Sequence, residues 1–121
     1  MAEPTRQTIG FIGLGIMGRP MSQNLNKAGY PLVVYDINPE PVRELVQLGA
    51  REARSSAEAA EEADLVITML PDSPDVEAAY LGPKGVLEGA RPGTLLVDMS
   101  TISPTVAIKV AEAAGKKGCS M

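Results

Sequence analysis

Three glycines near the start of the chain have the spacing of a phosphate-binding loop. Gly13, Gly15 and Gly18 form the pattern Gly-x-Gly-x-x-Gly within the stretch TIGFIGLGIMGRPM, between an apolar run and an expected helix start. In a dinucleotide site the first glycine allows a tight turn, the second leaves room for a pyrophosphate, and the third lets helix and strand pack closely. Backbone N–H groups of residues 14–17 would then point at the phosphates, aided by the helix dipole. Because the pattern also occurs by chance, a flexible turn remains the alternative.

Asp36 meets a second, independent condition for a dinucleotide site. It ends the next apolar run, at the position where such a site needs an acceptor for the adenosine ribose hydroxyls. Taken singly, Asp36 is better explained as a turn or capping residue, but together with the glycines it favours a dinucleotide. A carboxylate here would repel a 2′-phosphate, and Arg43 lies a turn into the next helix. The sequence therefore predicts NAD, with NADP the less favoured cofactor.

Polar groups also follow two later apolar runs. Ser100 and Thr101 offer hydroxyls within DMSTISP, and MLPDSPD (residues 69–75) closes the run before it. Plain strand-to-helix turns explain both stretches equally well without the glycine pattern, and Ser103 is adequately explained as a helix cap. We therefore assign no catalytic role to residues of these two stretches from their types alone.

Composition narrows the class of protein. The 121 residues are 45% hydrophobic and 21% charged, with no apolar run long enough to cross a bilayer. The net charge of −4 and scattered basic residues give nucleic acid no electrostatic footprint. The N-terminal MAEPTRQ lacks the layout of a secretory signal, so we expect a soluble, cytoplasmic protein. With one cysteine and no histidine, an internal disulfide and histidine catalysis are excluded and no metal site is predicted.

Apolar runs alternate with helical segments along the whole chain. Strands are predicted at residues 8–14, 31–36, 64–70 and 93–100, with a weaker extended piece at 50–53. Helix starts are predicted at four capping pairs: Asn38 with Pro39, Ser55 with Glu58, Ser73 with Pro74, and Ser103 with Pro104. Because each strand is apolar throughout, we expect an α/β fold, a doubly wound parallel sheet with helices on both faces.

Side-chain periodicity predicts which residues face the core. Met17, Met21, Leu25 and Ala28 recur at helical spacing, as do Val42, Leu45 and Val46. Met17, Met21 and Met69 are most simply core residues, and Cys119 a buried or fraying thiol.

With these segments in place, the chain resembles the β-hydroxyacid dehydrogenase family. GFIGLGIMGRPMSQNLNKAGY is similar to the family's N-terminal signature, and ITMLPDSPDVEAAYLGPKGVLEGARPGTLLVDMSTISP continues the likeness over nearly the whole chain. Both stretches are far more specific than three glycines. Within the family, the likeness is greatest to the tartronate semialdehyde reductase (2-hydroxy-3-oxopropionate reductase) branch. The resemblance implies a Rossmann-type NAD-binding domain of an oxidoreductase.

The resemblance also implies roles for individual residues. Leu14, Ile16 and Met17 would lend backbone groups to the pyrophosphate, and Asp36 would hold the adenosine ribose. Leu70 and Pro71 would border the cofactor, Asp75 would lie near its adenine, and Thr101 would lie near its nicotinamide. Ser100 and Thr101 would face the substrate. Relatives that use NADP often have Asn-Arg-Thr in place of Asp36, Ile37 and Asn38, which supports NAD here.

The chain departs from the family pattern at its end. The family's serine-glycine-glycine substrate segment and the G-x-x-x-K-x-x-N helix with its catalytic lysine do not occur in residues 1–121. None of the lysines occupies that motif, so none inherits the role of proton donor: Lys27, Lys84, Lys109, Lys116 and Lys117. KKGCSM resembles the lead-in to a further strand. We therefore expect a single dinucleotide-binding domain over residues 1–121, truncated before its last strands and without the helical catalytic domain.

Three hypotheses remain open. The first is the NAD-binding part of a reductase for a small 3-hydroxy or 2-hydroxy-3-oxo acid such as tartronate semialdehyde, whose parent enzyme is a homo-oligomer. Its proton donor would be a lysine outside this chain, so these residues alone would not turn substrate over. The second is a stand-alone NAD-sensing or interaction domain without catalysis, which predicts a stable, monodisperse protein. The third is a nucleotide-fold methyltransferase, which binding of NADH against S-adenosylmethionine would separate.

Overall fold

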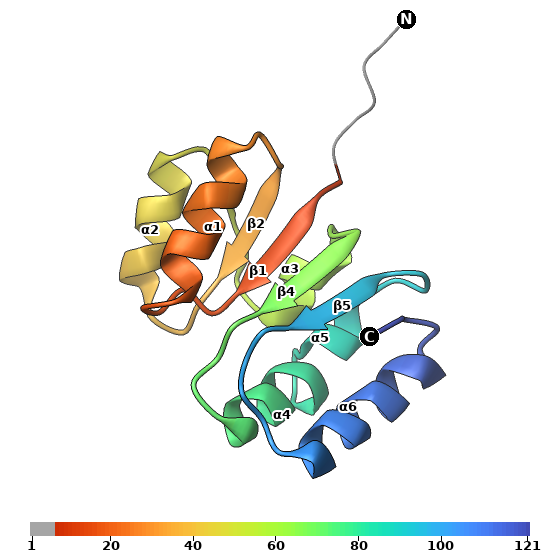
Figure 1. Cartoon of the computed structure of the whole chain (residues 1–121). Coiled ribbons are helices and arrows are strands. Elements are labelled where there is room, and N and C mark those ends of the chain that lie inside the picture. The colour runs from red at the N-terminus through yellow and green to blue at the C-terminus, as the bar shows by residue number, and fades with distance from the viewer. Residues whose placement is uncertain (1–6) are drawn as a thin grey trace, which may run out of the picture.

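The chain folds into a parallel sheet with helices on both faces (Figure 1). The structure, a computed structural model, describes residues 7–121; the interpretation of the N-terminal segment falls mostly on residues 1–6, outside this range. The strands are β1 (Ile9–Ile12), β2 (Leu32–Tyr35), β3 (Arg51–Glu52), β4 (Leu65–Thr68) and β5 (Leu95–Asp98). The helices are α1 (Gly18–Lys27), α2 (Pro39–Gln47), α3 (Ser56–Glu61), α4 (Ser73–Leu81), α5 (Val86–Gly89) and α6 (Pro104–Lys116).

The order of strands creates a switch point in the middle of the sheet. The order is β3-β2-β1-β4-β5, and all neighbouring strands pair in parallel. The chain runs outward from β1 to β3 and then returns to pair β4 with the free edge of β1. Loops after β1 and β4 therefore diverge at the carboxyl edge, where open parallel sheets bind ligands. The predicted fold class is confirmed.

Two apolar cores hold the helices on the sheet. On one face, α1 and α2 pack on alternate residues of β1 and β2, with Phe11, Val34 and Leu45 fully buried. On the other face, α3 to α6 cover Ile12, Val66 and other residues of opposite alternation. Burying both faces requires strands that are apolar at every position, which explains why these strands lack an apolar–polar alternation.

Helix starts follow the predicted capping residues. Asn38, Ser55 and Ser103 each accept a hydrogen bond from a backbone N–H in the first turn of α2, α3 and α6. For α4 the cap is Asp72, one residue before the predicted Ser73. Helix α5 was not predicted, because four residues are too few to display helical periodicity.

Three predicted core residues are wrong. Ala28 is exposed, because it caps the C-terminal end of α1. Met17 is 58% exposed, because α1 begins at Gly18 and Met17 lies in the loop before its first turn. Val46 is 39% exposed, because the stripe of α2 that meets the sheet is narrow and centres on Val42 and Leu45. Met21 and Met69 do pack against the core as predicted.

The last residues of the chain lie beside β5. Ser120 forms a parallel bridge with Leu95, and the Leu96 N–H donates to the Ser120 carbonyl at 2.7 Å. This pairing agrees with the expectation that KKGCSM leads into a strand. Cys119 is buried and its thiol donates to the Arg91 carbonyl at 3.4 Å, which confirms the buried alternative for that residue.

Candidate functional site

Two of the three motif glycines are required by close backbone approaches. Gly13 has φ of +99°, and a Cβ added there would lie 2.1 Å from the Met69 carbonyl oxygen. A Cβ added at Gly18 would lie 1.9 Å from the Gly13 carbonyl oxygen. The first glycine therefore permits the tight turn after β1, and the third lets α1 pack closely on that turn. These are the steric roles that the motif predicts for them.

Gly15 differs from both because its surroundings are open. An added Cβ would meet nothing within 4 Å. The N–H groups of Gly15, Ile16 and Met17 form no hydrogen bond within the described chain, and they lie at the N-terminus of α1. An open space above unpaired N–H groups at a helix N-terminus suits an anionic group such as a pyrophosphate. The loop therefore fits the phosphates of a dinucleotide.

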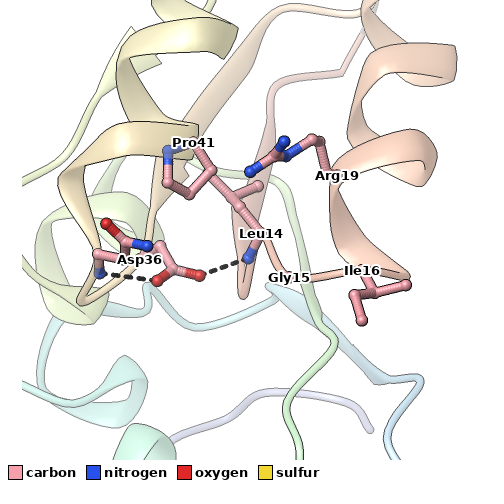
Figure 2. Close-up of a pocket in the computed structure, with 7 residues that line it drawn as sticks. Leu14, Gly15, Ile16, Arg19, Asp36 and Pro41 are labelled. Carbon is pink, nitrogen blue, oxygen red and sulfur yellow. Dashed lines mark hydrogen bonds between the residues drawn. The ribbon is translucent and has the colours of Figure 1, made fainter.

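Asp36 joins the end of β2 to the glycine loop. Its Oδ2 accepts a hydrogen bond from the Leu14 N–H at 2.6 Å, and its Oδ1 accepts one from the Asn38 N–H at 2.8 Å (Figure 2). The Leu14 N–H is thus directed at a carboxylate, and this differs from the expectation that it faces a phosphate. The geometry leaves Gly15, Ile16 and Met17 as the backbone donors of the loop.

A cleft of about 930 Å³ opens along the carboxyl edge of the sheet. It is bounded by the glycine loop, the end of β2, the loop after β4 and the first turns of α4. Most of the predicted cofactor-binding residues line it: Gly13, Gly15, Ile16, Met17, Gly18, Asp36, Leu70, Pro71 and Asp75. The cleft is large enough for much of a dinucleotide, since ligand sites commonly measure about 300–1,000 Å³.

The structure does not bring Ser100 and Thr101 into this cleft. Neither residue lines it, although both lie on the loop after β5. Thr101 is exposed, whereas Ser100 is half-buried. The Ser100 hydroxyl accepts a hydrogen bond from the Leu70 N–H at 2.7 Å and donates one to Asp98 Oδ1 at 2.7 Å. Ser100 thus lies behind the cleft wall that Leu70 forms.

A buried tyrosine continues this set of contacts. Tyr80, on α4, lies 2.9 Å from Thr68 Oγ1, which donates to Asp98 Oδ1 at 2.7 Å. Burial raises the pKa of the Tyr80 hydroxyl; the hydrogen bond with Thr68 lowers it and the charge of Asp98 adds to the rise. Sequence reasoning missed Thr68, Tyr80 and Asp98, because apolar neighbours made them look like ordinary strand and helix positions.

Arg19 also lies at the candidate site and was not predicted from the sequence. A hollow of about 360 Å³ adjoins Asp36, and it is lined by Leu14, Asn38, Pro41 and Arg19 among others (Figure 2). The Arg19 guanidinium forms a half-exposed ion pair with Glu44 at 3.3 Å. Its position directly after the last motif glycine was the available signal, because the first turn of that helix approaches the end of β2. Arg54 and Lys84, on the rim of the larger cleft, were also missed.

Residues 7–121 contain neither a membrane-spanning helix nor a cluster of metal-ligating side chains. No helix in this range is long and apolar enough to cross a membrane. Within the same range, no three acidic, cysteine or histidine side chains come together as metal ligands.

The switch-point cleft, the glycine loop and the acidic residue after β2 together define a Rossmann-type dinucleotide-binding domain. The sequence profile of the NAD binding domain of 6-phosphogluconate dehydrogenase matches residues 8–121. The chain belongs to the β-hydroxyacid dehydrogenase family of the 3-hydroxyisobutyrate dehydrogenase type, and it covers the NAD-binding domain of that family.

Curated relatives are oxidoreductases. The chain is 50% identical over 113 residues to an NAD-dependent L-serine dehydrogenase of Pseudomonas aeruginosa, covering 93% of the chain and 38% of that enzyme. It is 46% identical over 114 residues to the mitochondrial 3-hydroxyisobutyrate dehydrogenase of Mus musculus, covering 94% of the chain and 34% of that enzyme. The chain thus spans little more than a third of the length of these relatives. Neither of these two relatives is a tartronate semialdehyde reductase, so they do not single out that branch.

A solved relative has the same fold. The 3-hydroxyisobutyrate dehydrogenase of Mycobacterium tuberculosis, solved with L-serine, superposes with a TM-score of 0.87 at 43% identity, over 95% of this chain and 38% of that one. Solved structures of similar fold also include complexes with NADP⁺. A nicotinamide cofactor therefore characterises the family, and similar proteins include both an NAD-dependent enzyme and complexes with NADP⁺.

Proposed function

We propose that the cleft binds NAD, with the pyrophosphate over Gly15 and the adenosine ribose at Asp36. The observation that carries this proposal is the open space above Gly15, beside three N–H groups without protein partners and next to a carboxylate. Leu70 and Pro71 would border the cofactor, and Asp75 would lie near its adenine. Thr101, on the loop after β5 and outside this cleft, would lie near its nicotinamide.

Asp36 supports NAD over NADP. Its two carboxylate oxygens face the glycine loop and the start of α2, beside the hollow that a 2′-phosphate would enter. Two negative charges a few ångströms apart repel strongly where water is partly excluded. One curated relative is an NAD-dependent L-serine dehydrogenase, which agrees with this preference.

The reaction in which we place this domain is hydride transfer between the nicotinamide and a small hydroxy acid. The substrate would be a 3-hydroxy acid, or a 2-hydroxy-3-oxo acid such as tartronate semialdehyde. We assign the proton transfer to none of the five lysines of this chain, because none occupies the family's catalytic motif. A cytoplasmic location and a homo-oligomeric parent enzyme belong to the same proposal and rest on the sequence alone.

Titration of the full chain with NADH tests the cofactor proposal. Because the chain contains no tryptophan, the emission of bound NADH can be followed without tryptophan energy transfer. We expect saturable binding of NADH, weaker binding of NADPH and none of S-adenosylmethionine. Absence of saturable NADH binding by isothermal titration as well would refute the proposal. Steady reduction of tartronate semialdehyde by this chain alone would refute the assignment of the lysines.

A further inference from the structure

A line of hydrogen bonds runs beneath the loops that follow β4 and β5. Asp98 Oδ1 accepts bonds from Thr68 Oγ1 and from Ser100 Oγ, each at 2.7 Å. Thr68 Oγ1 also lies 2.9 Å from the Tyr80 hydroxyl, and Ser100 Oγ lies 2.7 Å from the Leu70 N. Thr68 is fully buried and Tyr80 is 1% exposed. The line therefore links α4, both strand ends and the cleft wall.

The carboxylate fixes the direction of every bond in this line. An ionised carboxylate can only accept, and each hydroxyl has one proton to donate. The Thr68 and Ser100 hydroxyls must therefore both donate their hydrogen bonds to Asp98. Thr68 in turn accepts from Tyr80, and Ser100 accepts from the Leu70 N–H. A line with one common acceptor has a single low-energy arrangement, because reversing any bond would leave a buried donor without a partner.

Burial of Tyr80 supports the assignment of its hydroxyl as the donor to Thr68. The pKa of Tyr80 is raised by its burial, so its hydroxyl remains a donor throughout the neutral range. No buried side-chain nitrogen or oxygen within residues 7–121 is left without a partner.

We propose that Asp98 is a positioning residue for the cofactor cleft and that it acts through Ser100. By orienting the Ser100 hydroxyl, Asp98 makes it an acceptor aimed at the Leu70 N–H, and so fixes the Leu70–Pro71 wall that lines the cleft. Ser100 then serves the protein backbone and has no proton left for a substrate, in contrast to the substrate-facing role that the resemblance implied. The identity of the ligand, but not the coupling itself, depends on the proposed function.

Cofactor affinity of matched variants tests this role. Ser100→Ala removes the acceptor for Leu70, and we expect the Kd of the full chain for NADH to rise about fivefold, the effect of one net hydrogen bond. Asp98→Asn should also weaken binding, whereas Ser100→Thr, which keeps the hydroxyl, should bind within about twofold of the unmodified chain. Tyr80→Phe is the matched control, because it removes a bond of the same line at the end remote from Leu70. Equal weakening by Tyr80→Phe and Ser100→Ala would overturn the proposal.

Amide exchange gives a readout that needs no cofactor. We expect the Leu70 N–H to exchange with solvent faster in Ser100→Ala and Asp98→Asn, and unchanged in Tyr80→Phe, when followed by NMR. Unchanged exchange in both Ser100→Ala and Asp98→Asn would overturn the positioning role. If the unmodified chain binds no NADH, the proposed function fails, and the exchange rates still decide whether Asp98 positions Leu70.

Discussion

The glycine-loop wall of the cleft, residues 13–18, is shaped by backbone sterics, whereas the neighbouring wall, residues 69–71, is supported by side-chain hydrogen bonds. On the first wall, two glycines stand where any Cβ would collide with a carbonyl oxygen. On the second wall, Ser100 and Asp98, about thirty positions along the chain, hold Leu70 from behind. The comparison teaches that the phosphate side tolerates almost no change at two positions, while the other side is adjustable through single hydrogen bonds.

The largest effect is expected from Gly18→Ala. The new Cβ would lie 1.9 Å from the Gly13 carbonyl oxygen, so α1 must move away from the loop. We expect the free energy of unfolding to fall by about 3 kcal/mol or more, measured by urea denaturation. Gly115→Ala is the matched control, because its added Cβ meets nothing within 4 Å and it lies within α6. It should leave stability unchanged or raise it by up to about 1 kcal/mol. Equal losses of unfolding free energy in both variants would contradict the steric requirement for glycine at position 18.

Gly15→Ala separates folding from binding within the same wall. Its Cβ has free space in the protein and should change the unfolding free energy by less than about 0.5 kcal/mol. The same methyl group would occupy the space assigned to the pyrophosphate, so we expect the Kd for NADH to rise at least about tenfold. Calorimetric titration measures both cofactor affinity and enthalpy. A variant that binds NADH as tightly as the unmodified chain would show that the phosphates lie elsewhere.

Asp36→Ser tests cofactor selection beside the glycine-loop wall. Removing the carboxylate should weaken NADH binding about tenfold, and relieve the repulsion of a 2′-phosphate. With that charge gone, Arg19 is the cation closest in the hollow to attract the phosphate of NADPH. We expect the NADPH to NADH affinity ratio to rise, and to fall back when Arg19→Gln is added. An unchanged ratio in the single variant would remove the main argument for NAD preference.

Tyr80→Phe should have the smallest effect. Loss of one hydrogen bond to Thr68 should lower the free energy of unfolding by about 1 kcal/mol at neutral pH. Because the folded pKa of Tyr80 is raised, its contribution is complete below the unfolded pKa of about 10 and is lost as the pH rises beyond it. Denaturation between pH 9 and 11 should therefore show a shallower alkaline decline in Tyr80→Phe than in the unmodified chain. If the unfolding free energy of both proteins declined equally with pH, the raised pKa of Tyr80 would be contradicted.

Much of the fold was predictable because its signals are local. Apolar runs gave the strands, and Asn38, Ser55 and Ser103 marked three helix starts by side-chain capping, which depends on neighbours within a few residues. Helix α5 and the exposure of Met17 were not predictable in this way. The first is too short to show a period, and the second depends on where α1 begins.

In the candidate site, too, residues with a local sequence signal were predicted, and residues defined by long-range contacts were missed. The glycine loop and Asp36 were identified from spacing alone, because a turn that brings a helix N-terminus to a strand end leaves a steric signature in the sequence. Arg19 escaped notice because only the packing of α1 beside the end of β2 puts it in the same hollow as Asp36. Asp98 was not predicted, because no local sequence feature shows which side chains bond to an aspartate at a strand end.

By itself, the sequence determined the parallel sheet, the place of the glycine loop and the family to which the chain belongs. Each follows from short-range rules: which residues can be buried, where a Cβ can fit and which side chains cap a helix. Only the tertiary structure decided that Asp36 bonds to Leu14, that Arg19 lines the same hollow as Asp36, and that Ser100 supports Leu70 from behind the cleft. Those contacts join segments far apart in the chain, and their partners are fixed by how the strands are ordered rather than by any local preference.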